Sequence, residues 1–208
     1  MTMKCVKFCG IRRDEDVTFV NELLPEYIGL IFYEKSHRNV TKQRAKQIRQ
    51  ALSPEIKAVG VFVDKPVEEV ADICLYAGLN LIQLHGNEDE DYITSLRKLT
   101  DLPLIKAVRF KNADDLYNAQ NLSADYLLVD TYIKDSVGGT GKTFDWNKLP
   151  PLNKPYFLAG GITTDNFKDA LKTDAYCIDI SSGIETDKVK DYNKMKQIIY
   201  LKGKDENE

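Results

Sequence analysis

The sequence has few of the residues that would cross-link a small secreted protein or hold a metal ion. It contains four cysteines and two histidines among 208 residues. None of the cysteines shows the paired spacing of a zinc site, and four are too few to cross-link a chain of this length. We therefore expect no metal and no disulfide framework, and four free thiols at Cys5, Cys9, Cys74 and Cys177.

The sequence also lacks long hydrophobic runs and any large excess of one charge. No apolar run approaches the roughly 18 residues of a membrane span, and the N-terminal segment lacks the apolar stretch of a secretory signal. The formal net charge is −3, from 29 basic and 32 acidic residues. Such a balance gives no general attraction for nucleic acid. We expect a cytoplasmic protein with neither a nucleic-acid partner nor a membrane partner.

What the sequence does contain is a repeated alternation of β-rich and amphipathic segments. This alternation is typical of βα units around a parallel sheet, which either closes as a (β/α)8 TIM barrel or opens as a doubly wound α/β sheet. The predicted strands are 4–9, 27–33, 56–63, 80–85, 103–108, 125–130, 155–159 and 176–181. The predicted helices are 14–24, 41–52, 67–77, 88–99, 113–121, a short one near Trp146, 164–171 and 190–201.

Polar residues inside the predicted strands favour the barrel. They recur with a period of two near strand ends, which places them on one face, and in a barrel that face lines the mouth. We therefore predict a single (β/α)8 domain over residues 1–202 and a polar tail over 203–208. The alternating pairs are Lys7 with Cys9, Gln83 with His85, and Asp179 with Ser181.

Two strand ends carry groups suited to proton transfer. Lys7 shares a face with Cys9, so its ammonium can favour the thiolate and prepare a base; the alternative is a thiol packed as an apolar side chain. Asp130 ends the sixth predicted strand, where it serves either as an acid or as a capping carboxylate. A glycine-rich stretch at 138–146 follows and is a candidate to close over a ligand.

Three loops carry signals for anion binding. Arg38 follows the second predicted strand, and its guanidinium can hold a planar carboxylate, unless this loop is simply solvated. Glycine-rich turns follow strands seven and eight, where barrels commonly bind phosphate through backbone N–H groups. Tight turns without a ligand are the alternative. The residues concerned are Gly160 and Gly161 in the first turn and Ser182 and Gly183 in the second.

His85 and Asp179 are expected to face the same opening. His85 ends the fourth predicted strand, where it is either a base or a hydrogen-bonded structural residue, and we assign it no proton transfer. Asp179 is placed to contact a substrate, or to pair inside the barrel with Lys7 or Lys106. Both are therefore candidates for the substrate site.

Taken in order, these segments resemble the phosphoribosylanthranilate isomerases. Single motifs among them are weak, but their order matches that family along essentially the whole chain. The matching stretches are 7–11, 29–38, 59–63, 83–86, 130–131, 138–146, 159–161 and 179–185.

The resemblance implies a TIM-barrel isomerase of tryptophan biosynthesis that needs no cofactor. The implied reaction is the Amadori rearrangement of the small-molecule substrate N-(5-phosphoribosyl)anthranilate to 1-(2-carboxyphenylamino)-1-deoxyribulose 5-phosphate. It implies Cys9 as general base, Asp130 as general acid and Arg38 as the residue that binds the substrate carboxylate. It leaves the oligomeric state open between monomer and homodimer.

Three positions depart from the family pattern without touching these residues. Phe8 stands where an aliphatic residue is usual, Glu34 where proline is common, and Lys188 where glycine is usual. The last puts the shape of the loop after strand eight in question.

Two other functions compete with this one. The related isomerase of histidine biosynthesis runs the same rearrangement on a similar barrel, but it uses an aspartate at the position of Cys9. A non-catalytic barrel that binds a phosphate-bearing ligand would need neither Cys9 nor Asp130. We therefore favour the anthranilate isomerase.

Overall fold

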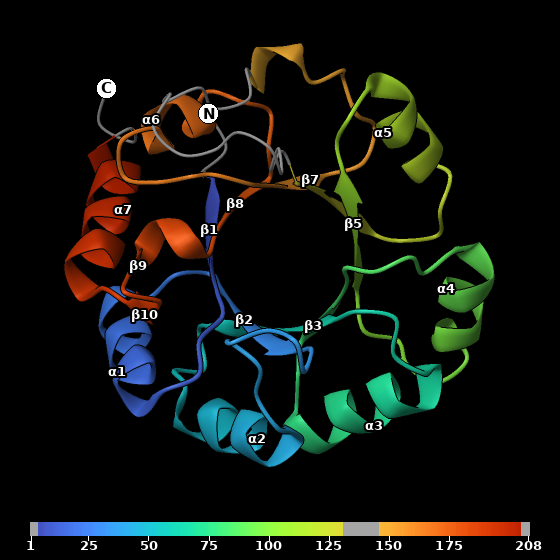
Figure 1. Ribbon diagram of the computed structural model, residues 1–208, viewed down its shortest axis with the longest axis horizontal. Coiled ribbons are helices and arrows are strands. Elements are labelled where there is room, and N and C mark those ends of the chain that lie inside the picture. The colour runs from blue at the N-terminus through green and yellow to red at the C-terminus, as the bar shows by residue number, and fades with distance from the viewer. Residues whose placement is uncertain (1–3, 131–145, 205–208) are drawn as a thin grey trace.

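The computed structural model describes residues 4–130 and 146–204, and its strands form a closed parallel barrel. The strands pair side by side in chain order, and β8 closes the ring on β1 (Figure 1). The predicted TIM barrel is therefore confirmed, and the alternative of an open doubly wound sheet is wrong. The strands are β1 (Cys5–Cys9), β2 (Tyr27–Phe32), β3 (Lys57–Phe62), β4 (Leu81–Leu84), β5 (Leu104–Arg109), β6 (Tyr126–Asp130), β7 (Tyr156–Ala159) and β8 (Cys177–Ile180).

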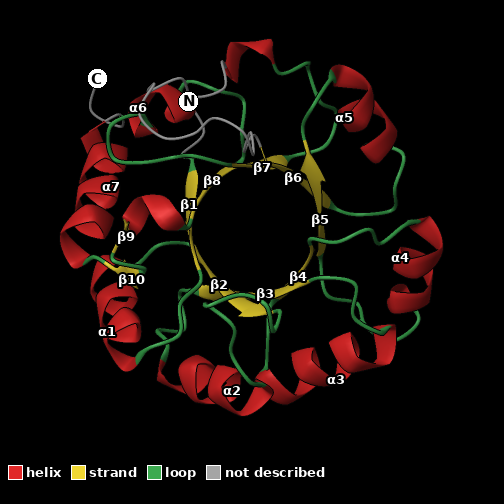
Figure 2. Cartoon of the chain, in the orientation of Figure 1, coloured by secondary structure: helices red, strands yellow, loops and turns green. Residues whose placement is uncertain are grey.

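The helices form an outer ring around the strands (Figure 2). Thr41 caps α2 as its position predicts, because its hydroxyl accepts the Arg44 backbone N–H over 3.1 Å. No helix in the described ranges is both long enough and apolar enough to span a membrane. The helices are α1 (Asp14–Leu23), α2 (Lys42–Ala51), α3 (Val67–Ala77), α4 (Glu90–Arg97), α5 (Ala113–Ala119), α6 (Phe167–Leu171) and α7 (Tyr192–Lys204), with the short 3-10 helices η1 (Trp146–Lys148) and η2 (Ser182–Ile184).

Several of the predicted helices begin one to three residues later than the sequence pattern indicates. The helix predicted from residue 164 begins at Phe167, because the Asn166 side chain accepts the Thr163 N–H over 2.8 Å and holds the preceding residues in a turn. The last helix begins at Tyr192 and ends at Lys204, so it extends into the predicted tail.

Strand alternation divides the buried side chains into two layers. Phe8, Ile28 and Leu30 point outward and pack beneath the helices, so the unusual phenylalanine lies away from the barrel interior. Inside the barrel, an aromatic floor includes Tyr27 and Tyr176, whose hydroxyls lie 2.8 Å apart. This packed floor leaves the polar residues of the upper layer as the lining of the mouth.

A hairpin that the sequence pattern did not predict follows η2. Strands β9 (Glu185–Thr186) and β10 (Val189–Lys190) pair antiparallel around a two-residue turn at Asp187 and Lys188. Both turn residues are left-handed, with φ of 51° and 62°. Such values belong to the type I′ turn, in which glycine is favoured at the second position, now held by Lys188. The loop after strand eight is therefore a tight hairpin. Its strands place Glu185 and Lys190 within hydrogen-bond distance of each other.

Candidate functional site

A cavity of about 390 Å³ opens at the carboxyl ends of the barrel strands. Active sites of TIM barrels lie at this end, because the βα loops there are built on a rigid ring of strands. The structure brings almost all of the predicted site residues to this cavity, Gly183 excepted. Those that line it are Cys9, Arg38, His85, Asp130, Gly160, Gly161, Asp179 and Ser182.

Lys7 is a buried charged residue that contacts two residues of the cavity wall, Gln83 and Asp179. Its side chain is fully buried, and its Nζ donates to Asp179 Oδ2 over 2.8 Å and to Gln83 Oε1 over 2.9 Å. Burial by itself would lower the pKa of Lys7, but the Asp179 carboxylate outweighs it and raises that pKa to about 12. Lys7 is therefore an ammonium at physiological pH.

The interior partner of Asp179 is thus Lys7 rather than Lys106. Lys106 lies on the helix side of β5, where its Nζ is 2.7 Å from a Glu88 carboxylate oxygen. The second oxygen of Asp179, Oδ1, is buried and has no hydrogen-bond partner among the residues that the structure describes. Buried polar atoms are normally paired, so this acceptor in the cavity wall is suited to a donor supplied by a ligand.

Cys9 faces the cavity with little exposure to solvent. Burial raises the pKa of the Cys9 thiol above its ordinary value, while the nearby Lys7 ammonium lowers it by less. Burial therefore outweighs the effect by which Lys7 is expected to favour the thiolate. Gly29 lies opposite in the register of β1 and β2, and a Cβ there would approach the Cys9 sulfur to 2.6 Å. The absence of a side chain at Gly29 makes room for the thiol.

Arg38 is held at the cavity rim by Glu185. Its Nε lies 2.7 Å from Glu185 Oε1 and its Nη2 2.5 Å from Oε2. Lys190 adds a contact of 2.7 Å to the same carboxylate. Burial alone would raise the pKa of Glu185, but the hydrogen bonds from Arg38 and Lys190 lower it to about 2. Two donors of Arg38 therefore already have a carboxylate partner, which sequence reasoning missed.

The backbone beneath Arg38 also depends on a glycine. Gly10 has a φ of 85°, and a Cβ there would lie 2.4 Å from Arg38 Cδ. Glycine thus allows both the left-handed backbone and the close approach of the arginine. The only sequence signals for this arrangement are that Gly10 and Glu185 fall within stretches 7–11 and 179–185.

Asp130 and His85 lie on the opposite side of the mouth from Arg38. Asp130 ends β6, and its Oδ2 lies 3.7 Å from His85 Nε2. Arg109, beside Asp130 in the register of β5 and β6, also lines the cavity. Sequence reasoning missed Arg109, although it shares the parity of the interior residues Ile105 and Ala107. This side of the mouth therefore combines a carboxyl group, an imidazole and a cation.

The two glycine-rich turns contact one another beside the cavity. Gly160 and Gly161 have φ values of 97° and 67°, a backbone that residues with side chains rarely adopt. Gly183 does not line the cavity, but a Cβ there would lie 1.8 Å from the Ile162 carbonyl oxygen. Gly183 therefore allows the close packing of the two turns, while Gly160, Gly161 and Ser182 face the cavity.

Some of the predicted features cannot be placed. Thr131 and most of the glycine-rich stretch at 138–146 lie outside the described residues, which resume at Trp146. Among the residues that the structure does describe, no group of three or more histidine, cysteine, aspartate or glutamate side chains is arranged to hold a metal ion.

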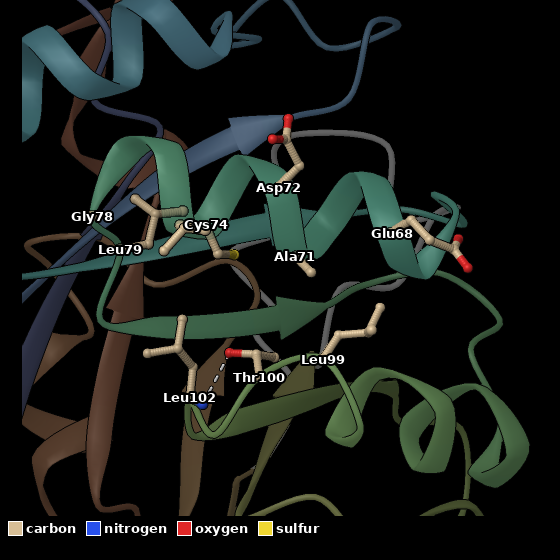
Figure 3. Close-up of a pocket in the computed structure, with 10 residues that line it drawn as sticks. Glu68, Ala71, Asp72, Cys74, Gly78, Leu79, Leu99, Thr100 and Leu102 are labelled. Atoms are coloured by element: carbon tan, nitrogen blue, oxygen red, sulfur yellow. Dashed lines mark hydrogen bonds between the residues drawn. The ribbon is translucent and has the colours of Figure 1, made fainter.

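A larger hollow of about 480 Å³ lies outside the barrel, between α3 and the segment that follows α4 (Figure 3). Its walls are mainly apolar, and none of the predicted site residues reaches it. Cys74 is the only thiol in its lining, and burial raises the pKa of that thiol to about 12. Size alone therefore does not locate the site, because this hollow lies away from the carboxyl ends of the strands and none of the predicted site residues lines it.

Comparison with known protein families agrees with this geometry. Residues 6–200 match the family model described as N-(5'phosphoribosyl)anthranilate (PRA) isomerase. The curated N-(5'-phosphoribosyl)anthranilate isomerase of Endomicrobium trichonymphae is 42% identical over 200 residues, which cover 96% of this chain and 98% of that protein. The enzyme of the same name from Thermoanaerobacter pseudethanolicus is 42% identical over 197 residues, covering 93% of this chain and 95% of that protein.

Solved structures lead to the same family. The phosphoribosyl anthranilate isomerase of Thermotoga maritima superposes with a TM-score of 0.83 at 32% identity, covering 97% of this chain and 100% of the other. A phosphoribosyl anthranilate isomerase in complex with reduced 1-(o-carboxyphenylamino)-1-deoxyribulose 5-phosphate superposes with a TM-score of 0.80 at 29% identity, with the same coverage of both chains. The family match spans the whole barrel, and the chain belongs to the N-(5'-phosphoribosyl)anthranilate isomerase family.

Proposed function

We propose that this isomerase converts N-(5-phosphoribosyl)anthranilate to 1-(2-carboxyphenylamino)-1-deoxyribulose 5-phosphate, with Cys9 as general base and Asp130 as general acid. The observation that carries the proposal is that both side chains line one cavity at the carboxyl ends of the strands. They approach it from β1 and β6, so a sugar between them can meet the acid on one side and the base on the other.

The reaction needs one proton delivered and one removed. Asp130 donates its proton to the ribose ring oxygen, the C–O bond at the anomeric carbon breaks, and the nitrogen lone pair forms a Schiff base. Cys9, as thiolate, then removes the proton from the adjacent sugar carbon; the electron pair left behind forms a C=C bond to the former imine carbon, and the C=N π pair returns to nitrogen, which gives an enolamine. Tautomerisation gives the ketone. The substrate nitrogen accepts the electrons, so this scheme uses no redox cofactor.

The basicity of Cys9 suits the second step. Burial raises the pKa of the thiol, so the thiolate is a stronger base once it forms than an exposed one would be. Lys7 and Lys190 both lower that pKa and therefore stabilise the thiolate. The Cys9 thiolate is therefore both basic enough to remove a proton from carbon and stabilised by nearby ammonium groups.

The anionic groups of the substrate match the cations and turns around the cavity. We assign the phosphate to the turns at Gly160, Gly161 and Ser182, where glycine lets backbone N–H groups approach an anion closely. We assign the anthranilate carboxylate to Arg38, at the Nη1 edge that Glu185 does not occupy. Asp179 Oδ1, which has no partner within the described part of the chain, is suited to accept a hydrogen bond from the substrate amine or a sugar hydroxyl.

Turnover of the substrate itself tests the proposal. The purified chain is mixed with freshly generated phosphoribosylanthranilate, and the loss of its fluorescence is followed. We expect rapid, enzyme-dependent loss, and no comparable turnover of the aminoaldose substrate used by the isomerase of histidine biosynthesis. Binding of phosphoribosylanthranilate without turnover would instead support a non-catalytic barrel and contradict the proposal.

A substitution at Gly29 tests the position of the Cys9 thiol without removing any reacting group. Gly29→Ala puts a methyl carbon 2.6 Å from the present position of the Cys9 sulfur, which is too close, so the thiol must shift. A displacement of about 1 Å at a reacting group can cost on the order of 100-fold, and we expect kcat to fall about 10- to 100-fold. Gly203→Ala is the matched control, because a Cβ there meets nothing within 4 Å. Equal activity of the two variants would show that the thiol position does not limit the reaction.

A further inference from the structure

A chain of polar contacts crosses the barrel from Lys7 to His85. Lys7 Nζ donates to Gln83 Oε1 over 2.9 Å, and Gln83 Nε2 lies 2.8 Å from His85 Nδ1. An ammonium has only donors, so the oxygen of the Gln83 amide must face Lys7. The amide nitrogen must then face the imidazole. Lys7 and Gln83 are 0% and 1% exposed, so a reversed amide would set two donors against each other away from water.

The orientation of Gln83 determines the tautomer of His85. An amide nitrogen can only donate, so Nδ1 of the ring must accept, and a neutral imidazole then carries its proton on Nε2. That nitrogen is the one that faces Asp130, at 3.7 Å from Oδ2. The Lys7 ammonium thus fixes the orientation of Gln83, and Gln83 fixes the tautomer of His85. As a result, the His85 Nε2–H points at the Asp130 carboxyl group.

We propose that Lys7 and Gln83 are positioning residues that hold the His85 Nε2–H toward Asp130, where it stabilises the carboxylate formed when Asp130 gives up its proton. The proposal rests on the proposed role of Asp130 as the acid. Preorganised donors aimed at developing charge are among the larger contributions to catalysis. The distance of 3.7 Å is longer than a hydrogen bond, and contacts of this kind often tighten when substrate binds. His85 transfers no proton in this scheme.

Two substitutions at His85 separate a donor toward Asp130 from a purely structural role. In His85→Gln the side-chain amide reaches the position of Nε2 and can still donate to Asp130. In His85→Asn the amide reaches only the position of Nδ1, so it keeps the Gln83 contact and loses the donor. We expect kcat to fall about 10- to 100-fold in His85→Asn with KM little changed, and His85→Gln to recover most of that loss. Equal kcat losses in the two variants would overturn the proposal.

Gln83→Glu tests the origin of the tautomer without any substrate. The variant keeps the shape of the side chain and an oxygen for Lys7, but it presents a second acceptor to the imidazole. In nitrogen-15 NMR spectra we expect wild-type His85 to carry its proton on Nε2, and Gln83→Glu to move a proton onto Nδ1. The exposed His37 is the only other histidine, so its unchanged signals serve as an internal control.

The NMR spectra and the turnover assay test different parts of the inference. A wild-type ring with its proton on Nδ1, or no change in Gln83→Glu, would overturn the role of Lys7 and Gln83 whatever the activity. An Nε2–H ring in a protein that does not turn over phosphoribosylanthranilate would count against the proposed function, and with it against the catalytic part of this inference.

Discussion

Cys9→Ala should lower kcat by about 10²- to 10⁴-fold, because a general base typically contributes a factor of that size. Alanine removes the thiolate without adding bulk, so the barrel should remain folded and substrate binding should change little. Steady-state kinetics, with thermal unfolding as a check on the fold, measure this effect. Near wild-type turnover by folded Cys9→Ala would exclude Cys9 as the base.

The matched control for Cys9 is a second buried thiol. Cys177 lies in β8 within the barrel interior, is fully buried and does not line the cavity. Cys177→Ala should therefore leave kcat within about threefold of wild type, since the loss of a buried sulfur affects packing rather than chemistry. A comparable fall in kcat for both variants would point to a general disturbance of the barrel.

The pH dependence of kcat/KM should carry the signature of the same thiol. Burial raises the pKa of the Cys9 thiol above its ordinary value, and Lys7 opposes this by less, so burial favours the neutral thiol. The active thiolate fraction then rises about tenfold per pH unit below that pKa, and kcat/KM should rise with it between about pH 7 and 9. Cys9→Asp supplies a carboxylate that is already ionised at neutral pH, so this alkaline rise should disappear.

Asp130→Asn should cause a loss of similar size, about 10²- to 10⁴-fold in kcat, because an amide cannot deliver a proton to the ribose ring oxygen. Asparagine nearly matches aspartate in shape, so KM and the melting temperature should change little. Asp125→Asn is the control, since Asp125 directly precedes the opposite end of β6 and pairs with Arg97. Its kcat should stay within about threefold of wild type.

If Asp130→Asn lowered kcat only slightly, Asp130 would not be the general acid. His85 also lines that part of the cavity wall, and an imidazole is a common acid–base group. In that case His85→Gln, which keeps a donor but cannot transfer a proton, should cause the large loss instead. The pair of variants therefore decides which side chain is the acid.

Features set by local periodicity could be predicted from the sequence. A strand repeats its facing every two residues, so the shared face of Lys7 with Cys9 and of Gln83 with His85 followed from spacing alone. The same spacing favoured a barrel with a polar mouth, and the closed ring confirms it. The capping role of Thr41 was also readable, because a cap depends only on neighbouring residues.

Pairings between distant segments could not be predicted in this way. Arg38 and Glu185 are 147 residues apart, and only barrel closure and the β9–β10 hairpin bring them together. The choice of Lys7 over Lys106 as partner of Asp179 likewise depended on the register in which β1 meets β8. Nothing in the local sequence distinguishes these partners, because each contact joins strands or loops remote in the chain.

The sequence by itself determined the order of the units, the inward facing of Cys9 and Asp130, and the glycine turns, because each depends on spacing within a few residues. Only the tertiary structure decided the direction in which the pKa of Cys9 shifts. Desolvation and nearby charge both act through space, so the burial that raises the pKa of Cys9 depends on every strand around it. For the same physical reason, the tautomer that we infer for His85 depends on a buried lysine of another strand.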